Sequence, residues 1–278
     1  MKTASRSRMA FAVLAALGLG LIGFAPVAKA DWNPGDPYKM HFPQLPDLTP
    51  NGVDVLATYG GYWFNPASQS YVQLGNKVLA DDFMCTQTGP ITDIHIWGSW
   101  LSDARDLNAR FHLSIHSDIP AGVGGLPYST PGPTLWSMDL NPAHQRFWGT
   151  ASEQFYDPNS QRILGADTQV WQYNFYIDPL LAFHQQAGML YWLDVQYIPT
   201  EPFTTTLFGW KTSLQHFQDD GVYGDNLSPG GDPSSWAELI YPTGQSRDLA
   251  FVITTPEPSA FALTGLGAAA LLVFRRRR

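Results

Sequence analysis

The residues whose types best suit a chemical role form an acidic run with two glycines, Asp219-Asp220-Gly221-Val222-Tyr223-Gly224-Asp225-Asn226. Carboxylate and amide oxygens on a flexible loop are the ligands that Ca²⁺ takes, although the bidentate Glu that ends an EF-hand is missing. Asp81 and Asp82 offer a second acidic pair for the same ion. The alternative is turn formation, which Asp, Asn and Gly favour without a metal. We predict no cofactor beyond a structural calcium ion, with candidate ligands Asp219, Asp220, Asp225 and Asn226.

Histidines alternate with apolar residues in two predicted strands. Asp93 and His95 would share one polar face, and His112 and His116 would share another. Zinc would require three or four such ligands to converge. The alternation by itself already places these histidines on a polar sheet face, so we favour that simpler interpretation over a zinc site.

Tryptophan is abundant, with ten residues in the chain. Exposed aromatic rings can stack on the apolar faces of sugars, but large aromatics also dominate the cores of β proteins. Trp192 and Trp210 stand in apolar stretches and are predicted to be core. Trp97 and Trp100 are the candidate glycan-binding residues, provided that Gly98 shifts the alternation and turns them outward.

Sequence motifs for catalysis are absent. No G-x-S-x-G, H-E-x-x-H or P-loop pattern occurs. Glycoside hydrolysis needs a carboxylate pair at a fixed separation, and Glu153, Glu201 and Glu238 stand in no recognisable motif. Cys85 is the single cysteine, which excludes an intrachain disulfide and suits a buried small side chain. We predict that the protein is not an enzyme.

Short strands must position all of these residues. Residues 110–116 alternate clearly, with Phe111, Leu113 and Ile115 on one face. Further strands are expected in the ranges 53–59, 77–83, 91–100, 134–140, 169–177, 189–198, 205–211 and 248–253. Residues 178–188 are the one expected helix, with Asp178 as N-cap and Pro179 at the first position. About ten strands separated by turn residues predict an antiparallel β-sandwich or jelly roll over residues 53–254, after an irregular lead-in at 31–52.

The N-terminal segment has the pattern of a secretory signal peptide. Positive residues precede an apolar run over 9–24, and Ala28-Lys29-Ala30 resembles a signal-peptidase site. We therefore predict that residues 1–30 are a signal peptide, cleaved after Ala30, and that the body of the protein is exported.

The C-terminal segment has three linked parts. Thr255-Pro256-Glu257-Pro258 precedes an uncharged span at 259–274, and four arginines follow. As a helix this span would reach about 24 Å, short of a hydrocarbon core of about 30 Å, a gap that snorkelling arginines and local thinning can cover. Arginines stay on the cytoplasmic side. A transmembrane sorting helix at 259–274 is predicted, with transient insertion in the inner membrane.

This tail resembles a PEP-CTERM sorting signal, although Thr255 replaces the valine common at that place. The resemblance implies processing by an exosortase-type membrane protease in a Gram-negative bacterium that makes exopolysaccharide. The implied sorting and processing residues are Pro256, Glu257, Pro258, Arg275, Arg276, Arg277 and Arg278. A plain tail anchor is the alternative, but two prolines hold the site extended, as a protease cleft requires.

Stretches of the body resemble an uncharacterised β-sandwich family often carried on PEP-CTERM proteins. They are Leu79-Ala80-Asp81-Asp82-Phe83, Gly89-Pro90-Ile91-Thr92-Asp93-Ile94-His95-Ile96-Trp97-Gly98 and Leu113-Ser114-Ile115-His116-Ser117-Asp118-Ile119-Pro120. The resemblance implies a fold and a location, and no activity comes with it.

Charge narrows the function further. Residues 31–257, which include Glu257, contain eight basic and 24 acidic residues, a formal charge of −16, which excludes the basic face that nucleic acid requires. We predict an exported protein of the outer envelope or extracellular matrix, structural or adhesive, without catalysis. A lectin-like carbohydrate-binding module is the alternative, and an unrecognised hydrolase is the third. The expected partners are the exosortase and extracellular polysaccharide.

Overall fold

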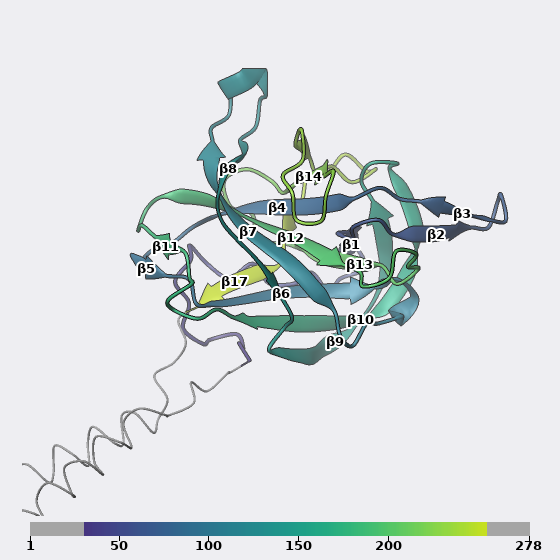
Figure 1. Cartoon of the computed structure of the whole chain (residues 1–278), viewed down its shortest axis with the longest axis horizontal. Helices are drawn as coiled ribbons and strands as arrows, with labels where there is room; N and C mark the ends of the chain where they lie inside the picture. Colours follow the sequence, from purple (N-terminus) through teal and green to yellow (C-terminus); the bar gives the residue numbers. More distant parts are fainter. Residues whose placement is uncertain (1–30, 255–278) are drawn as a thin grey trace, which may run out of the picture. The chain divides into compact units, whose positions relative to one another are not determined.

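The computed structural model describes residues 31–254, which build an all-β body of two large sheets and two small ones (Figure 1). The first sheet has the order β16-β13-β1-β9-β10-β6-β17. Its strands are β16 (Asp248–Leu249), β13 (Phe208–Ser213), β1 (Val53–Leu56), β9 (His144–Asp157), β10 (Arg162–Tyr176), β6 (Asp93–Trp100) and β17 (Phe251–Thr254). The prediction of an all-β fold is confirmed.

A further pairing of β13 with β6 closes five of these strands, β13-β1-β9-β10-β6, into a small barrel. β1 and β9 pair in parallel, whereas the other pairs of this sheet are antiparallel. The closed ring and the parallel pair go beyond the antiparallel sandwich that the sequence predicts. Strand pairing at such sequence separation leaves no local signal, because alternation reports only which face of a strand is buried.

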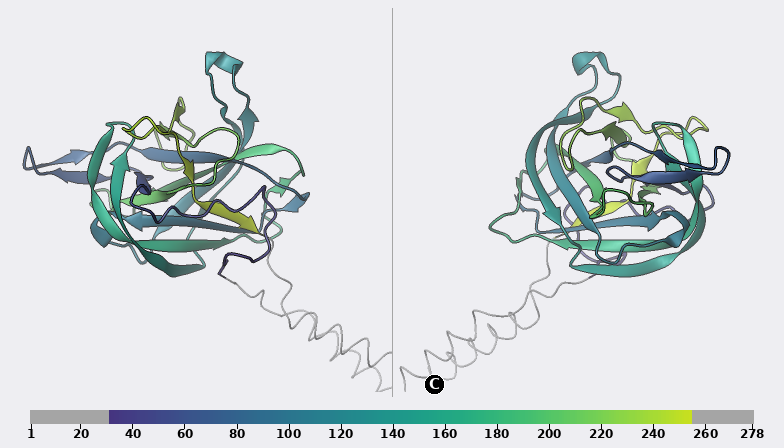
Figure 2. Two further views of the ribbon diagram at one scale, coloured as in Figure 1. Left: turned by 180° about the vertical axis from the view of Figure 1, so that it is seen from behind. Right: turned by 45° about the vertical axis from the view of Figure 1, so that its right-hand side comes forward.

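The second sheet is antiparallel throughout, in the order β15-β14-β4-β12-β7-β8. Its strands are β15 (Ala237–Glu238), β14 (Val222–Asp225), β4 (Lys77–Met84), β12 (Leu190–Ile198), β7 (Arg110–Ile119) and β8 (Thr130–Leu140). Two small strand pairs complete the body: β2 (Tyr62–Asn65) with β3 (Ser70–Gln73), and β5 (Gly89–Pro90) with β11 (His184–Gln185). Figure 2 shows the β2–β3 hairpin in dark blue, projecting from the side of the body. Leu101–Asp103 and Val123–Gly125 form 3₁₀ turns.

The main core contains apolar residues from both large sheets. Phe111 of β7 meets Phe208 of β13 edge to face, with ring centroids 4.9 Å apart, and the predicted apolar face of β7 is wholly buried. Burial of each such side chain contributes roughly 1.5–3 kcal/mol. Gly98 allows a close approach between β6 and β13, since a Cβ there would lie 2.3 Å from the ring of Phe208.

Two local predictions are wrong. Residues 178–188 form a turn and the short strand β11, not a helix. The side chain of Asp178 does cap the turn, accepting a hydrogen bond from the Leu180 amide at 2.9 Å, but Leu180 and Leu181 are exposed. A short helix gains most of its stability from burying an apolar face, and here no such face is buried. The strand β9 was not predicted, because its first half is only partly buried and its sequence does not alternate.

The lead-in over residues 31–52 has no regular strand, as predicted, yet it belongs to the core. It forms isolated bridges through Met40, Gln44 and Pro46, and Trp32 is buried. The predicted signal peptide at 1–30 and sorting tail at 255–278 lie outside the described residues. Within residues 31–254, no helix is long and apolar enough to cross a bilayer.

Candidate functional site

Carboxylates gather where β16, the edge strand of the first sheet, lies near β4 of the second sheet and the loop between β13 and β14. This acidic site consists of Asp81, Asp82, His216, Asp219, Asp220 and Asp248. Asp81 and Asp82 are successive residues of β4 and point to opposite faces of their strand. Asp248 lies on β16, and the remaining three residues come from the loop. The site therefore joins both sheets.

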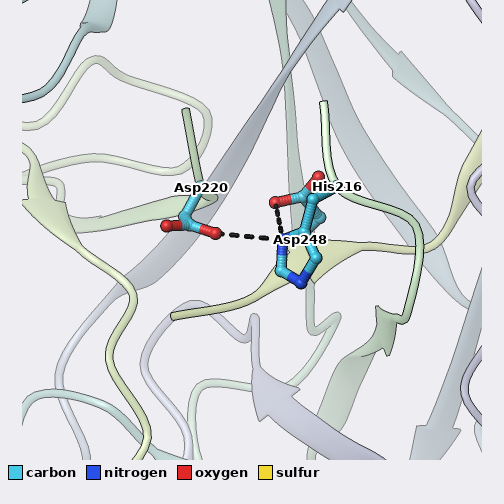
Figure 3. Close-up of side chains that lie close together, drawn as sticks. All are labelled: His216, Asp220 and Asp248. Carbon is cyan, nitrogen blue, oxygen red and sulfur yellow. Dashed lines mark hydrogen bonds and ion pairs between the residues drawn. The ribbon is translucent and has the colours of Figure 1, made fainter. Parts of the chain in front are cut away.

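His216 lies between two of the carboxylates (Figure 3). Its Nδ1 is 3.1 Å from Oδ1 of Asp220 and 3.2 Å from Oδ1 of Asp248. The backbone amide of Phe217 donates to Oδ2 of Asp248 at 2.7 Å. Ligand atoms of His216, Asp220 and Asp248 all lie within 4.8 Å of one another, which is the convergence that a cation requires.

Gln44 brings the lead-in to this site. Its Nε2 donates to Oδ2 of Asp81 at 2.9 Å and to Oδ2 of Asp248 at 3.2 Å. The Leu249 amide also donates to Oδ2 of Asp81, at 2.6 Å. The side-chain amide of Gln44 thereby bridges two buried carboxylates, Asp81 and Asp248, from different sheets.

Asp82 faces the other side of β4. Its Oδ2 accepts a weak hydrogen bond from the Asp219 amide at 3.4 Å, while its buried Oδ1 has no hydrogen-bond partner among residues 31–254. Asp219 in turn accepts from the hydroxyl of Ser129 at 2.5 Å. An unpaired buried carboxylate oxygen is costly, so Asp82 is the residue of the site that would gain most from a cation.

Burial shifts the acids of this site toward their neutral forms. It raises the pKa of Asp82 to about 9, even though the Asp219 amide opposes the shift. Burial also raises the pKa of Asp248 to about 7, although the hydrogen bond from the Phe217 amide lowers it. Asp81 also has a pKa well above its ordinary value, because burial is reinforced by the charges of Asp248 and Asp82. A bound cation would reverse these shifts by favouring the carboxylates.

The structure divides the four predicted calcium ligands into two pairs. Asp219 and Asp220 lie in the acidic site together with the alternative pair Asp81 and Asp82. The other two ligands, Asp225 and Asn226, lie elsewhere: Asp225 pairs with Nζ of Lys77 at 2.5 Å, and Asn226 exchanges hydrogen bonds of 2.9 and 3.1 Å with Gln196. The reason is β14, an extended segment of about 3.3 Å per residue that carries the two ends of the run apart.

Sequence reasoning missed His216 and Asp248. His216 stands four residues before Asp220, which was the available signal. Asp248 is far from His216 and Asp220 in the sequence, and no sequence signal linked it to them.

The histidines considered for zinc do not converge. His95 of β6 contacts Asn174, Asp93 and Thr254. His112 and His116 lie on β7 of the other large sheet. The simpler interpretation, polar positions on a sheet face, describes them better, with the difference that they are buried.

Ser114, His116 and Asp194 form a hydrogen-bonded group on β7 and β12. Nε2 of His116 lies 2.8 Å from the Ser114 hydroxyl and 2.9 Å from Oδ2 of Asp194. A Ser-His-Asp triad needs the hydroxyl and the carboxylate on different ring nitrogens. Here they share one nitrogen, and Nδ1 faces the Gly132 carbonyl at 3.0 Å. All three side chains are buried, so this group is not arranged as an activated nucleophile.

The prediction that Trp97 and Trp100 bind glycan is wrong, because both side chains are buried. They are 0% and 1% exposed. Trp97 lies edge-on to Trp32, with centroids 5.9 Å apart. The indole of Trp100 donates to the hydroxyl of Tyr173 at 2.6 Å. Gly98 does not turn them outward; instead, the lead-in covers the face on which Trp97 lies.

A different tryptophan lines a surface groove. Trp63 of β2 lies at an open groove of about 450 Å³. Its indole donates to the Leu164 carbonyl at 2.6 Å, which holds the ring in place. Polar residues line the rest of the groove, among them Asn76, Asp157, Asn159, Ser160, Arg162 and Asp225. We call this the Trp63 groove.

The hairpin that carries Trp63 exposes further aromatic rings. Phe64 and Tyr71 are 48% and 54% exposed, and their centroids are 5.4 Å apart. Phe203 extends the row, 5.4 Å from Tyr71. The signal for this surface was the run Tyr62-Trp63-Phe64 directly before the turn Asn65-Pro66, since three successive aromatics cannot all face one core.

Comparison with known proteins adds a family and a sorting signal to the all-β class that the fold defines. Residues 40–254 match the family described as a domain of unknown function, DUF7901. The chain belongs to this family. Residues 254–278 match the PEP-CTERM protein-sorting motif, which confirms the suspected resemblance and implies export, transient membrane sorting and exosortase processing. No curated protein matches the chain.

Proposed function

We propose that this protein is a non-catalytic, adhesive component of the outer envelope or extracellular matrix, and that it binds extracellular polysaccharide in the Trp63 groove. The observation that carries the proposal is the groove itself, where a fixed tryptophan meets polar residues. Its volume of about 450 Å³ falls within the range of about 300–1,000 Å³ typical of ligand sites.

The composition of the groove suits a sugar chain. The apolar face of a pyranose can stack on Trp63, and amide, carboxylate and guanidinium groups can bond to its hydroxyls. The exposed rings of Phe64, Tyr71 and Phe203 lie on the other face of the hairpin, because Phe64 follows Trp63 directly in β2 and pairs with Tyr71. Export to a cell surface that carries polysaccharide supports the same ligand.

The carboxylates of the groove favour binding over hydrolysis. Asp157 accepts hydrogen bonds from the Asn159 amide and the Ser160 hydroxyl, and Asp225 pairs with Lys77. Each is held as an acceptor, whereas a glycosidase needs one member of its pair to donate a proton.

We propose in addition that the acidic site binds a structural calcium ion. The observation that supports it is the convergence of His216, Asp220 and Asp248. An ion there would join the lead-in, both sheets and the 216–220 loop.

A glycan array and a pull-down with the host exopolysaccharide test the adhesive role. The processed protein should bind, and Arg162→Ala should bind several-fold more weakly because it removes an exposed guanidinium group from the lining of the groove. Arg110→Ala is the matched control, since Arg110 is another exposed arginine, on β7 and outside the groove. Absence of any glycan bound by the wild type would end this proposal, and release of reducing sugars would replace it with hydrolysis.

A further inference from the structure

The small barrel encloses polar side chains, one from each of its five strands. This barrel cluster consists of Asp54 (β1), Ser99 (β6), Glu153 (β9), Asp167 (β10) and Lys211 (β13). Each residue is at most 2% exposed. A barrel interior of this size is normally filled by apolar side chains, so four ionisable groups at its centre require an explanation.

Lys211 contacts two of the three carboxyl groups. Its Nζ lies 3.1 Å from Oδ2 of Asp54, and it is also in contact with Oε2 of Glu153. Asp54 and Lys211 are directly opposite each other in the antiparallel β1–β13 pair. The amine is therefore held between two carboxyl groups on adjacent strands.

The remaining polar atoms of the cluster are poorly satisfied. Within the described part of the chain, Oε1 of Glu153 has no hydrogen-bond partner, and the carboxyl groups of Asp54 and Asp167 share the Ser99 hydroxyl and a contact with each other. One lysine faces three acids, so full ionisation would leave two uncompensated negative charges in a dry interior. A set of buried charges this incomplete is not explained as a simple salt bridge.

Burial drives Lys211, Asp54 and Asp167 toward their uncharged forms. It lowers the pKa of Lys211, and it raises the pKa of Asp54 in spite of the opposing charge of that lysine. Burial also raises the pKa of Asp167 to about 9. A neutral amine and a protonated carboxyl are the forms that condense to an amide.

We propose that Lys211 and Asp54 are joined by an intramolecular amide bond, with Glu153 as the proton carrier. The lone pair of the neutral Nζ attacks Cγ of protonated Asp54 and forms a tetrahedral intermediate. The carboxylate of Glu153 takes a proton from Nζ and passes it to the departing hydroxyl. The Cγ–O bond then breaks, one water leaves, and Glu153 returns to its starting form.

The reaction needs no oxidant and no cofactor, because one amine and one acid give one amide and one water. Its driving features are local. The register holds the reacting groups together, which replaces a bimolecular encounter, and the product exchanges buried ionisable groups for a neutral amide.

A crosslink of this kind would suit an exported protein that has a single cysteine and hence no intrachain disulfide. It would tie β1, near the start of the body, to β13, and so close a loop between residues 54 and 211. Such a loop constrains the unfolded chain as a disulfide does. The inference is independent of the Trp63 groove and of the calcium site.

Peptide mapping of the processed full-length protein, isolated from its host, tests the proposal directly. Trypsin should fail to cut after Lys211, and one branched peptide should contain both Lys211 and Asp54. Its mass should be one water, about 18 Da, below the sum of its two parts. Two separate linear peptides of full mass would overturn the proposal.

Variants separate the crosslink from a merely structural role. Glu153→Gln should fold but lack the branched peptide, and Asp54→Asn should form the bond with loss of ammonia, about 17 Da, instead of water. Lys77→Met is the control: Lys77 is another buried lysine paired with an aspartate, and this variant should keep the branched peptide. A loss of water that maps to Asp220-Gly221 would be a backbone succinimide and would also overturn the proposal.

Discussion

The barrel cluster and the acidic site use the same residue types in opposite surroundings. Each brings carboxylates from several strands to within reach of one basic side chain. The barrel cluster is sealed, whereas His216 of the acidic site has a side chain that is 54% exposed. Solvent access is what distinguishes them. An open site can exchange its protons for a cation, but a closed one can relieve its charge only among its own residues.

The largest effect should follow from removing the base of the barrel cluster. Lys211→Met removes the amine that joins Asp54, and loss of a covalent crosslink of the disulfide kind typically costs about 2–5 kcal/mol. The free energy of unfolding, measured by urea denaturation, should fall by an amount in that range. A loss below about 1 kcal/mol would show that no crosslink constrains the chain at Lys211, and would weaken the contrast with the acidic site.

Calcium should stabilise the protein through the acidic site alone. At a calcium concentration of about 100 times Kd, the gain is about 2.7 kcal/mol, visible as a higher midpoint of thermal unfolding that EDTA reverses. Asp220→Asn should abolish most of this gain. Asp225→Asn is the matched control, because Asp225 belongs to the same acidic run in the sequence but lies outside the site, and it should keep the calcium response. An equal loss in both variants would contradict the proposed ligands.

Stability should fall as pH rises when calcium is absent. The folded-state pKa values of Asp82 (about 9) and Asp248 (about 7) lie above their ordinary unfolded values. The folded protein therefore binds more protons than the unfolded one between about pH 4 and pH 9, and its stability decreases across that window. Urea midpoints at pH 5 and pH 8 measure this difference. Saturating calcium should reduce this decrease of stability with pH, because the ion stabilises the carboxylates of the acidic site.

The smallest effect is expected at the imidazole of the acidic site. Calcium prefers oxygen ligands, so His216→Ala should change the calcium-induced gain in stability by no more than about 0.5 kcal/mol, as for most exposed positions. Isothermal titration with calcium and with zinc distinguishes the two ions. A large loss of calcium affinity would identify His216 as a ligand and point to a softer metal.

Local patterns carried much of the information on the fold. The alternation in residues 110–116 placed Phe111, Leu113 and Ile115 in the core, where the structure has them. The same reasoning failed for β9, whose partly buried first half does not alternate. It also failed for Trp97, which is covered by Trp32 of the irregular lead-in and by Trp148 of the unpredicted strand β9.

Sites were harder to predict than strands. The pair Asp219 and Asp220 and the pair Asp81 and Asp82 were each recognised from composition, but their meeting depends on how β4 and the 216–220 loop pack. The barrel cluster left no trace in the sequence, since its five residues come from five separate strands. Each of them looks unremarkable in its own stretch.

The sequence by itself determined that this protein carries a PEP-CTERM sorting signal, and it determined the all-β character of the body. Sorting signals are contiguous, and strand alternation is local, so both can be read along the chain. Only the tertiary structure decided which carboxylates meet, which tryptophan lines a groove, and that five strands close around Lys211. Those outcomes depend on pairings such as Asp54 with Lys211, 157 residues apart, and alternation within a strand does not specify which distant strand will lie beside it.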